Sequence, residues 1–211
     1  MSIIDITPAL SSTSLAFPGD TVFKAEPVME IGEDCPVNVS RLTLSSHAGA
    51  HADAPLHYHR EGTPIHAIDL DPYIGPCTVV HMINHDEVIT LSVLEKTLAA
   101  SGEALAPRIL IRTYENQPDT WDPAFTAVSA DAITWLASNG VKLIGVDTPS
   151  LDPATSKTMD AHNAIYQNNM RILEGLKLDN VAAGTYELIA LPLKLEGLDA
   201  APVRAILRTL P

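Results

Sequence analysis

The sequence predicts one β-rich α/β domain with a mixed sheet, spanning residues 1–211. Short runs of β-forming residues surround a middle section with helical periodicity, and this mixture is typical of an α/β sheet. With 211 residues, 46% of them hydrophobic, the chain is long enough for one sizeable core and too short for two comfortable domains. No internal repeat, low-complexity stretch or linker divides the sequence, so we expect a single domain.

Short β-type runs, separated by turns that contain proline or glycine, dominate the first third of the chain. The second run alternates between two sets of side chains, as a strand does, and leads directly into a group of histidines. We expect strands over residues 3–6, 37–44 and 77–83.

The middle of the chain changes to helical periodicity. One helix is expected at 92–100, where the periodic segment is closed by Gly102. A second is expected at 129–139, which opens with a Ser129 cap and ends at Gly140. Further along the chain, a short helix should begin at Asp160 and end near Asn168. Additional strands are expected at residues 109–113, 141–147, 170–173, 186–193 and 203–207.

Charge and hydropathy restrict the possible partners. The formal net charge is −13, and the 13 lysines and arginines are scattered, whereas a nucleic-acid-binding surface needs clustered basic residues. We therefore expect small molecules or another subunit as partners and no nucleic acid. Neither a signal peptide nor an apolar run of about 18 residues is visible, which predicts a cytoplasmic protein with no membrane span. Cys35 and Cys77 are too few and too far apart for a disulfide framework, so reduced thiols are expected.

Four side chains that can bind metal or transfer protons fall within eleven residues: His47, His51, Asp53 and His57. Imidazole nitrogen with carboxylate oxygen is a ligand set that Zn²⁺ and similar divalent ions prefer. A helix would point Asp53 away from His47 and His51, whereas an extended chain puts all four odd-numbered positions on one side. Pro55 should end any regular strand, so we expect a strand end that runs into a loop.

The other histidines before residue 100 lack such spacing. We assign a structural or surface role, and no site role, to His59, His66, His81 and His85.

His162 and Glu174 are the best candidates for further ligands from elsewhere in the chain. On one continuous helix they would lie about 18 Å apart, too far to share a centre, so the chain must break between them. Asn168-Asn169 is a plausible stop. A carboxylate at Glu174, within an otherwise apolar run, needs a partner if it is buried. The sequence leaves open whether each residue is a ligand, and Glu174 could instead face the surface.

The run His47-Ala-Gly-Ala-His51-Ala-Asp53-Ala-Pro55-Leu-His57 resembles the HxGxHxDxPxH signature of the cyclase family of metal-dependent amide hydrolases. Essentially the whole chain resembles the bacterial kynurenine formamidase branch of that family. Four further segments carry this resemblance in order and spacing: Phe17-Pro18-Gly19-Asp20, Gly145-Val-Asp147-Thr-Pro-Ser-Leu-Asp152, Lys157-Thr-Met-Asp160-Ala-His162 and Tyr186-Glu-Leu-Ile-Ala-Leu-Pro192-Leu.

The resemblance implies a swivelling β/β/α domain, a homodimer and two divalent metal ions per subunit, with Zn²⁺ as the expected metal. It implies that His47, His51 and Asp53 ligate one ion, that His162 ligates the other, and that Asp53 and Glu174 bridge both. It also implies that His57 transfers protons. The residue before Pro-Gly-Asp contacts the substrate and is usually Trp in that branch. Here it is Phe17, which keeps a stacking face but lacks the indole N–H donor.

The implied reaction is hydrolysis of N-formyl-L-kynurenine to L-kynurenine and formate, in tryptophan degradation by the kynurenine pathway. The residues suit this chemistry, because a metal can activate water at neutral pH and His57 can carry a proton to the leaving amine. Two alternatives stay open: a hydrolase of the same family that opens another amide such as isatin, and a non-catalytic zinc-binding protein. A closed structural site needs no spare histidine, which disfavours the last. Ligand types also leave Mn²⁺ and Co²⁺ possible beside Zn²⁺.

Overall fold

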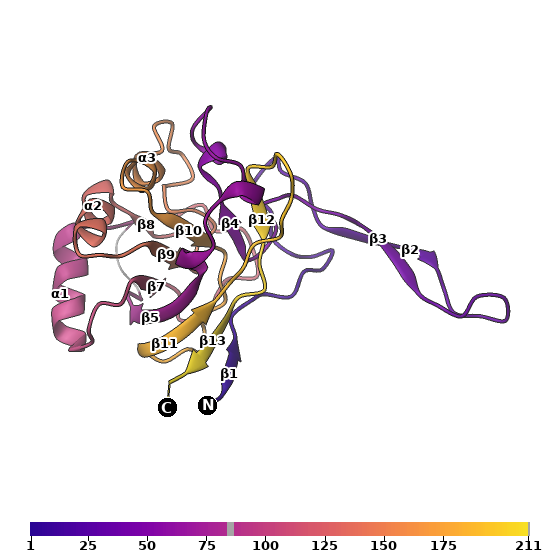
Figure 1. Ribbon diagram of the computed structural model, residues 1–211, viewed down its shortest axis with the longest axis horizontal. Coiled ribbons are helices and arrows are strands. Elements are labelled where there is room, and N and C mark those ends of the chain that lie inside the picture. Colours follow the sequence, from indigo (N-terminus) through magenta and orange to yellow (C-terminus); the bar gives the residue numbers. More distant parts are fainter. Residues whose placement is uncertain (84–86, 211) are drawn as a thin grey trace.

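The computed structural model describes residues 1–83 and 87–210 and shows a mixed α/β domain built on a nine-stranded sheet (Figure 1). The strand order is β1-β13-β11-β5-β7-β9-β10-β4-β12. The predicted fold class is therefore confirmed. In chain order, the strands of this sheet are β1 (Ile3–Asp5), β4 (His51–Asp53), β5 (Ile74–His81), β7 (Arg108–Arg112), β9 (Leu143–Val146), β10 (Arg171–Glu174), β11 (Gly184–Ile189), β12 (Ala200–Pro202) and β13 (Ile206–Thr209).

Four neighbouring strands, β5, β7, β9 and β10, run parallel, and the strands outside them are antiparallel. Helices connect the parallel strands, as a crossover between parallel strands requires. All three lie together on one side of the sheet (Figure 1). They are α1 (Leu91–Ser101), α2 (Ala130–Ser138) and α3 (Asp160–Gln167).

Two clusters of buried apolar residues pack against the two faces of the sheet. On β7, Ile109 and Ile111 belong to the cluster that also contains Leu94 of α1 and Leu136 of α2, whereas Leu110 between them belongs to the other cluster. This alternation follows from the period of two along a strand. It explains why the central strands read as continuous apolar runs in the sequence.

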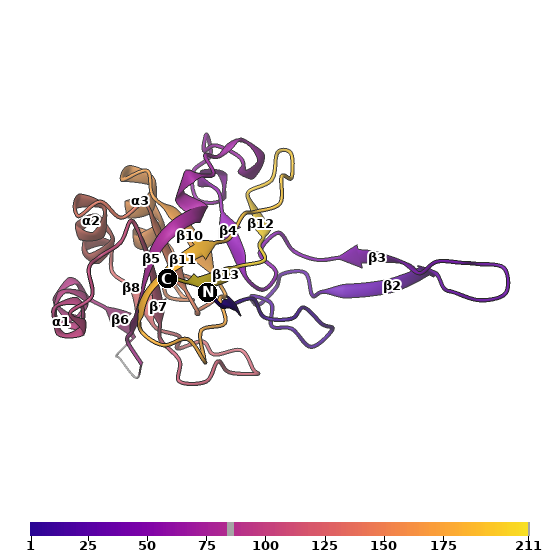
Figure 2. The ribbon, with the colours of Figure 1, turned by 60° about the horizontal axis from the view of Figure 1, so that its bottom comes forward.

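A two-stranded arm, β2 (Lys24–Met29) with β3 (Val39–Thr43), projects away from this body (Figures 1 and 2). Every residue of both strands is exposed, and the pairing shifts register between Pro27 and Met29. The remaining small elements are the parallel pair β6 (Val88–Ile89) and β8 (Ala127–Val128) and the 3₁₀ turns at Pro55–His57, Ile65–Ala67 and Asp71–Tyr73.

All three helices lie where the sequence predicts them, and Gly102 closes α1 with a φ of +68°. The strand expected at 37–44 exists as β3, but it does not lead directly into the histidines, because it belongs to the arm and turns separate it from β4. The partner strand β2 was not expected. The last strand begins at Ile206 and not at residue 203, because residues 200–202 form the separate strand β12 beside β4.

Both cysteines are free thiols, with Cys77 buried and Cys35 half-buried, as the sequence predicts. Among residues 1–83 and 87–210, the helices are too short and too polar to span a bilayer.

Candidate metal centre

The centre lies where β4 runs antiparallel between β10 and β12, near one edge of the sheet. In this register His51 pairs with Glu174 and Asp53 pairs with Ile172. Directly opposed residues point to the same face, and residues two apart along a strand do too, so His51, Asp53 and Glu174 share one face. All seven residues of β4 and β10 are buried. The first turn of α3 adds His162, and the loop before β4 adds His47.

The side chains of these five residues converge on two carboxylates. Asp53 Oδ1 lies 3.1 Å from His47 Nδ1 and 3.5 Å from His51 Nε2. Asp53 Oδ2 lies 3.5 Å from His162 Nε2. Glu174 is arranged in the same way, with Oε2 at 3.4 Å from His51 Nε2 and Oε1 at 3.5 Å from His162 Nε2. Each carboxylate therefore faces His51 with one oxygen and His162 with the other.

Within the described part of the chain, three buried atoms at the middle of this group have no hydrogen-bond partner: His51 Nε2, Asp53 Oδ1 and Asp53 Oδ2. Buried polar atoms are almost always paired, and leaving one unpaired costs about 1–3 kcal/mol or more when it is charged. A divalent cation among them would satisfy a nitrogen and two carboxylate oxygens at once, with the ligand types that such ions take. The residues present thus fit a metal.

The outward nitrogen of each histidine has a hydrogen-bond acceptor. His51 Nδ1 lies 2.9 Å from the carbonyl oxygen of Gly49, His162 Nδ1 lies 2.6 Å from Asp152 Oδ2, and His47 Nε2 lies 2.9 Å from Asp199 Oδ2. A carbonyl oxygen can only accept, so His51 Nδ1 carries the proton and Nε2 presents its lone pair to the centre. Such outer partners orient histidine ligands in metal sites.

Electrostatics in the centre favours charged forms despite burial. Burial alone would lower the pKa of His47, but ion pairs with Asp53 and Asp199 outweigh it and raise the pKa to about 9. Burial would raise the pKa of Asp53, yet the nearby His162 and His47 imidazoles hold it well below its ordinary value. The carboxylates are therefore ionised, and His47 carries a proton at neutral pH that a metal ion would have to displace.

His57 lies at the rim of the centre, in the 3₁₀ turn that follows β4. Its side chain is 31% exposed, and its Nδ1 lies 3.3 Å from Asp199 Oδ2. Its ring centroid is 4.2 Å from that of His47 and 6.0 Å from that of His162. His57 can also come together with Asp53 and His162 within 4.8 Å, so geometry alone allows it to be a ligand as well as a free base. Pro55 ends β4 and starts the turn, as the sequence predicts.

A cavity of about 420 Å³ adjoins the centre and is lined by Phe17, His51, Trp121 and Asp147 among others. Phe17 is 43% exposed and packs edge to face against Trp121, with ring centroids 5.0 Å apart. Phe17 and Trp121 come from loops far apart in the sequence, and together they give the cavity an aromatic wall.

The structure brings together all the metal-ligand candidates that the sequence singled out. Glu174 is buried, so a surface-facing position is wrong for it, and the break between His162 and Glu174 occurs where expected, with Asn168 at the end of α3 and Asn169 at a φ of +52°.

Three residues with contacts at the site were not singled out: Asp152, Asp199 and Trp121. Asp152 lies in a segment that carries the family resemblance and follows a buried strand, which was a usable signal. Asp199 and Trp121 stand in loops with no ligand-like spacing, so no sequence pattern pointed to either residue.

The histidines without a site role make other contacts. His59 stacks on Tyr166 at 4.1 Å, His66 Nδ1 accepts a hydrogen bond from the backbone of Gly197, and His81 Nε2 bonds to the Val181 carbonyl. His85 lies outside the described residues.

The family model of Cyclase, described as "Putative cyclase", matches residues 4–153, which is more than half of the chain and includes the histidine cluster. The chain belongs to the Cyclase family. Solved structures agree over nearly the full length. One described as a "potential metal-dependent hydrolase with cyclase activity" is 27% identical, with a TM-score of 0.82, and the match covers 98% of this chain and 96% of that one.

A second structure, described as a "predicted metal-dependent hydrolase from Bacillus stearothermophilus", is also 27% identical, with a TM-score of 0.80 and coverage of 98% and 97%. An isatin hydrolase bound to the product analogue thioisatinate is 24% identical, with a TM-score of 0.84 and coverage of 97% and 91%, and shares the fold. The chain thus has the fold of cyclase-family metal-dependent hydrolases and a His/Asp group able to hold metal.

Proposed function

We propose that this protein is a metal-dependent amide hydrolase that converts N-formyl-L-kynurenine and water to L-kynurenine and formate, a step of tryptophan degradation. The observation that carries the proposal is the pair of buried carboxylates between three histidines, with unpaired atoms at the middle, beside a cavity with an aromatic wall. The family match and the metal-dependent hydrolases of similar structure support the hydrolase class.

Two divalent ions, most naturally Zn²⁺, are proposed for the centre. His47, His51 and Asp53 would hold one, His162 the other, and Asp53 with Glu174 would bridge both. The two-sided placement of each carboxylate, one oxygen toward His51 and the other toward His162, supports this division. When bound, such ions supply Lewis acidity, which acidifies water and polarises a carbonyl oxygen.

His57 is proposed as the residue that moves the proton. Hydrolysis breaks the bond between the formyl carbon and the aryl amine nitrogen, and the amine leaves easily only when protonated. The proton given up by the attacking water must therefore reach that nitrogen. A histidine suits both directions of transfer, because its ordinary pKa is close to neutral pH. His57 is partly exposed beside His47 and His162, so its ring can be reached from solvent at the edge of the centre.

Phe17 is proposed to contact the aryl ring of the substrate. It stands in the cavity wall with Trp121, and the same cavity reaches His51 of the centre. An aromatic substrate amide held against this wall would present its carbonyl toward the metal ligands.

Isatin is the second candidate substrate. Isatin hydrolases share the fold, with TM-scores of 0.84 and 0.81, although their identities of 24% and 23% carry no argument beyond the fold. Both substrates contain an amide on an aromatic ring. A non-catalytic zinc-binding protein is disfavoured, because the centre adjoins an open cavity and has His57 beyond the proposed ligand set.

The decisive experiment is turnover of N-formylkynurenine and isatin by the purified protein, together with measurement of bound metal by mass spectrometry. We expect two ions per chain, faster turnover of N-formylkynurenine, and loss of activity after chelation that added metal restores. Glu174→Gln should lower the metal content, since the amide removes a negative charge from the centre. Undiminished activity in metal-free protein would refute the proposal. Faster turnover of isatin than of N-formylkynurenine would make isatin the assigned substrate instead.

We further propose that the partner is a second copy of this chain. The arm exposes several large apolar residues, including Val28, Met29, Val39 and Leu42, and an isolated hairpin is marginally stable in water. Sedimentation velocity should show a dimer, and Leu42→Asp should shift it toward monomer. A monomer at all concentrations in the unmodified protein would contradict this.

A further inference from the structure

We propose that Asp199 is a positioning residue that fixes the tautomers of both His47 and His57, and so links metal binding to proton transfer. The inference deepens the proposed function of this site and rests on it. It assigns Asp199 no contact with substrate.

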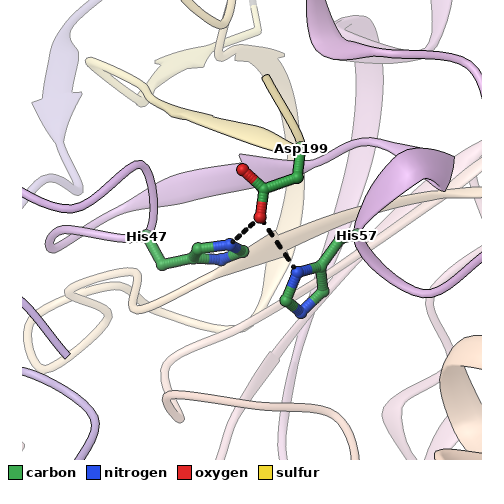
Figure 3. Close-up of side chains that lie close together, drawn as sticks. All are labelled: His47, His57 and Asp199. Carbon is green, nitrogen blue, oxygen red and sulfur yellow. Dashed lines mark hydrogen bonds and ion pairs between the residues drawn. The ribbon is translucent and has the colours of Figure 1, made fainter. Parts of the chain in front are cut away.

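One oxygen of the Asp199 carboxylate serves both rings. Oδ2 lies 2.9 Å from His47 Nε2 and 3.3 Å from His57 Nδ1 (Figure 3). The other oxygen, Oδ1, accepts a hydrogen bond from Ser46 Oγ at 3.0 Å. Figure 3 shows the two imidazoles converging on the carboxylate from different segments of the chain.

The backbone of Asp199 is fixed by the same strand that supplies the ligands. Its carbonyl oxygen accepts a hydrogen bond from the N–H of Ala54 at 2.8 Å, and the next residue, Ala200, pairs with Asp53 across the β12–β4 ladder. The carboxylate is therefore held in position from the backbone side as well as through Ser46. Asp199 is therefore an ordered part of the centre.

Hydrogen-bond chemistry then determines where the protons lie. An ionised carboxylate can only accept, and Asp is ionised at neutral pH. His47 Nε2 and His57 Nδ1 must therefore both donate. In the metal-free chain His47 Nδ1 faces ionised Asp53 and keeps its proton as well. A metal held beside Asp53 would displace that proton and take up the Nδ1 lone pair, whereas the lone pair of His57 Nε2 stays free to accept a proton.

The other outer partners contact one histidine each. Asp152 holds His162 and also accepts hydrogen bonds from the backbone N–H groups of Ala161 and His162 at the start of α3. His51 Nδ1 donates a hydrogen bond to the backbone carbonyl oxygen of Gly49, which can only accept. Asp199 differs because a metal-ligand candidate and the proposed proton-transfer residue depend on the same oxygen.

The test is Asp199→Asn, which keeps the shape but replaces one acceptor oxygen by an NH₂ donor. In zinc-loaded protein with ¹⁵N-labelled histidine, we expect the Nδ1–H tautomer of His57 in the unmodified chain and a shift toward Nε2–H in the variant. We expect metal affinity to fall about 10- to 100-fold, the usual cost of losing an outer partner. With metal saturating, kcat should fall at least tenfold while KM changes less than about twofold.

Two further variants separate positioning from folding. Asp199→Glu keeps the carboxylate and should recover part of both the tautomer and the metal affinity. Asp69→Asn removes the same charge at an exposed position outside the site and should leave all readouts unchanged. In the His57→Ala background, Asp199→Asn should still weaken metal binding through His47 but should lower kcat by less than about threefold.

An unchanged His57 tautomer together with unchanged metal affinity in Asp199→Asn would overturn the inference, as would a kcat loss of equal size in the His57→Ala background. The tautomer and the metal affinity need no substrate. If N-formylkynurenine proves not to be hydrolysed, the proposed function fails while these two readouts still decide the role of Asp199.

Discussion

The candidate metal centre and the β2–β3 arm lie almost next to each other in the sequence but have opposite environments. Strand β4 is completely buried, and its neighbours β10 and β12 come from the last quarter of the chain. Strand β3 ends at Thr43, only four residues before His47, yet it pairs with β2 alone and all its residues are exposed.

The two regions differ in the contacts that stabilise them. In the centre, buried charges stabilise one another, so the removal of one leaves the others unpaired at a cost of several kcal/mol. In the arm, a side chain has little contact with the core of its own chain, and a substitution there should affect mainly a partner. Four variants test this contrast, from the largest expected effect to the smallest.

The largest effect is expected at the rim of the centre. His57→Ala should lower kcat by roughly 10²- to 10⁴-fold, the usual contribution of positioned proton transfer, while the bound metal and the fold remain. Steady-state kinetics with metal analysis checks this, and His51→Ala, which removes a proposed ligand, is the matched variant that should lose metal. If His57→Ala also purified without metal, His57 would belong to the ligand set and the centre would extend to its rim.

Asp147, directly after β9, tests how much a buried charge beside the cavity lowers the stability of the folded chain. Burial raises its pKa from 3.8 to about 6, although hydrogen bonds from Thr113 and Tyr114 act in the opposite direction. Because its pKa is higher in the folded than in the unfolded chain, its stabilising contribution is complete below pH 3.8 and is lost as the pH rises through about 6.

Asp147→Asn stays neutral at every pH. The free energy of unfolding of the unmodified chain, relative to this variant, should therefore fall by about 2 kcal/mol between pH 4.5 and 7.5. Urea unfolding of both metal-free proteins at the two pH values measures this, and the other titrating groups cancel in the difference. If the difference in free energy of unfolding between the two proteins stays constant with pH, burial does not raise the pKa of Asp147.

Phe17 is intermediate, since it is partly exposed but faces the cavity. Phe17→Ala should raise KM several-fold with little change in kcat, because stacking on an aryl ring contributes about 0.5–1.5 kcal/mol beyond area burial. Phe17→Leu keeps most of the apolar volume without the ring and serves as its control. Unmodified kinetics in Phe17→Ala would place substrate elsewhere in the cavity.

The smallest effect is expected in the arm. Arg41 pairs with Glu26 across the two strands, but both side chains are more than half exposed. Arg41→Ala should change the free energy of unfolding of the monomer by less than about 0.5 kcal/mol, as is usual for surface ion pairs. The measurement needs a protein concentration at which the chain is monomeric. A loss above 1 kcal/mol would mean that the arm contributes to the stability of its own chain.

The sequence predicted the two regions unequally. Three proposed ligands and His57 were found because they stand in one short run whose spacing is itself informative, and β7, β9 and the helices were found because their apolar patterns reflect burial. The arm was missed as a unit, because only the strand at 37–44 was expected and nothing in the sequence pattern pointed to its partner β2 or to the exposure of residues such as Val28 and Val39. Asp199 could not be found, since it lies 152 positions from His47 and only the β12–β4 pairing brings the two together.

The position of β4 between β10 and β12 also determines the order of assembly during synthesis. The segment that holds His47 and Asp53 leaves the ribosome long before β10 and β12, so Asp53 cannot meet Glu174 until more than a hundred further residues have been made. Pairings between such distant segments form slowly, because a long loop must close before they contribute any stability. If the proposed ions bind, occupancy of the full ligand set would therefore mark a chain in which these distant strands have paired.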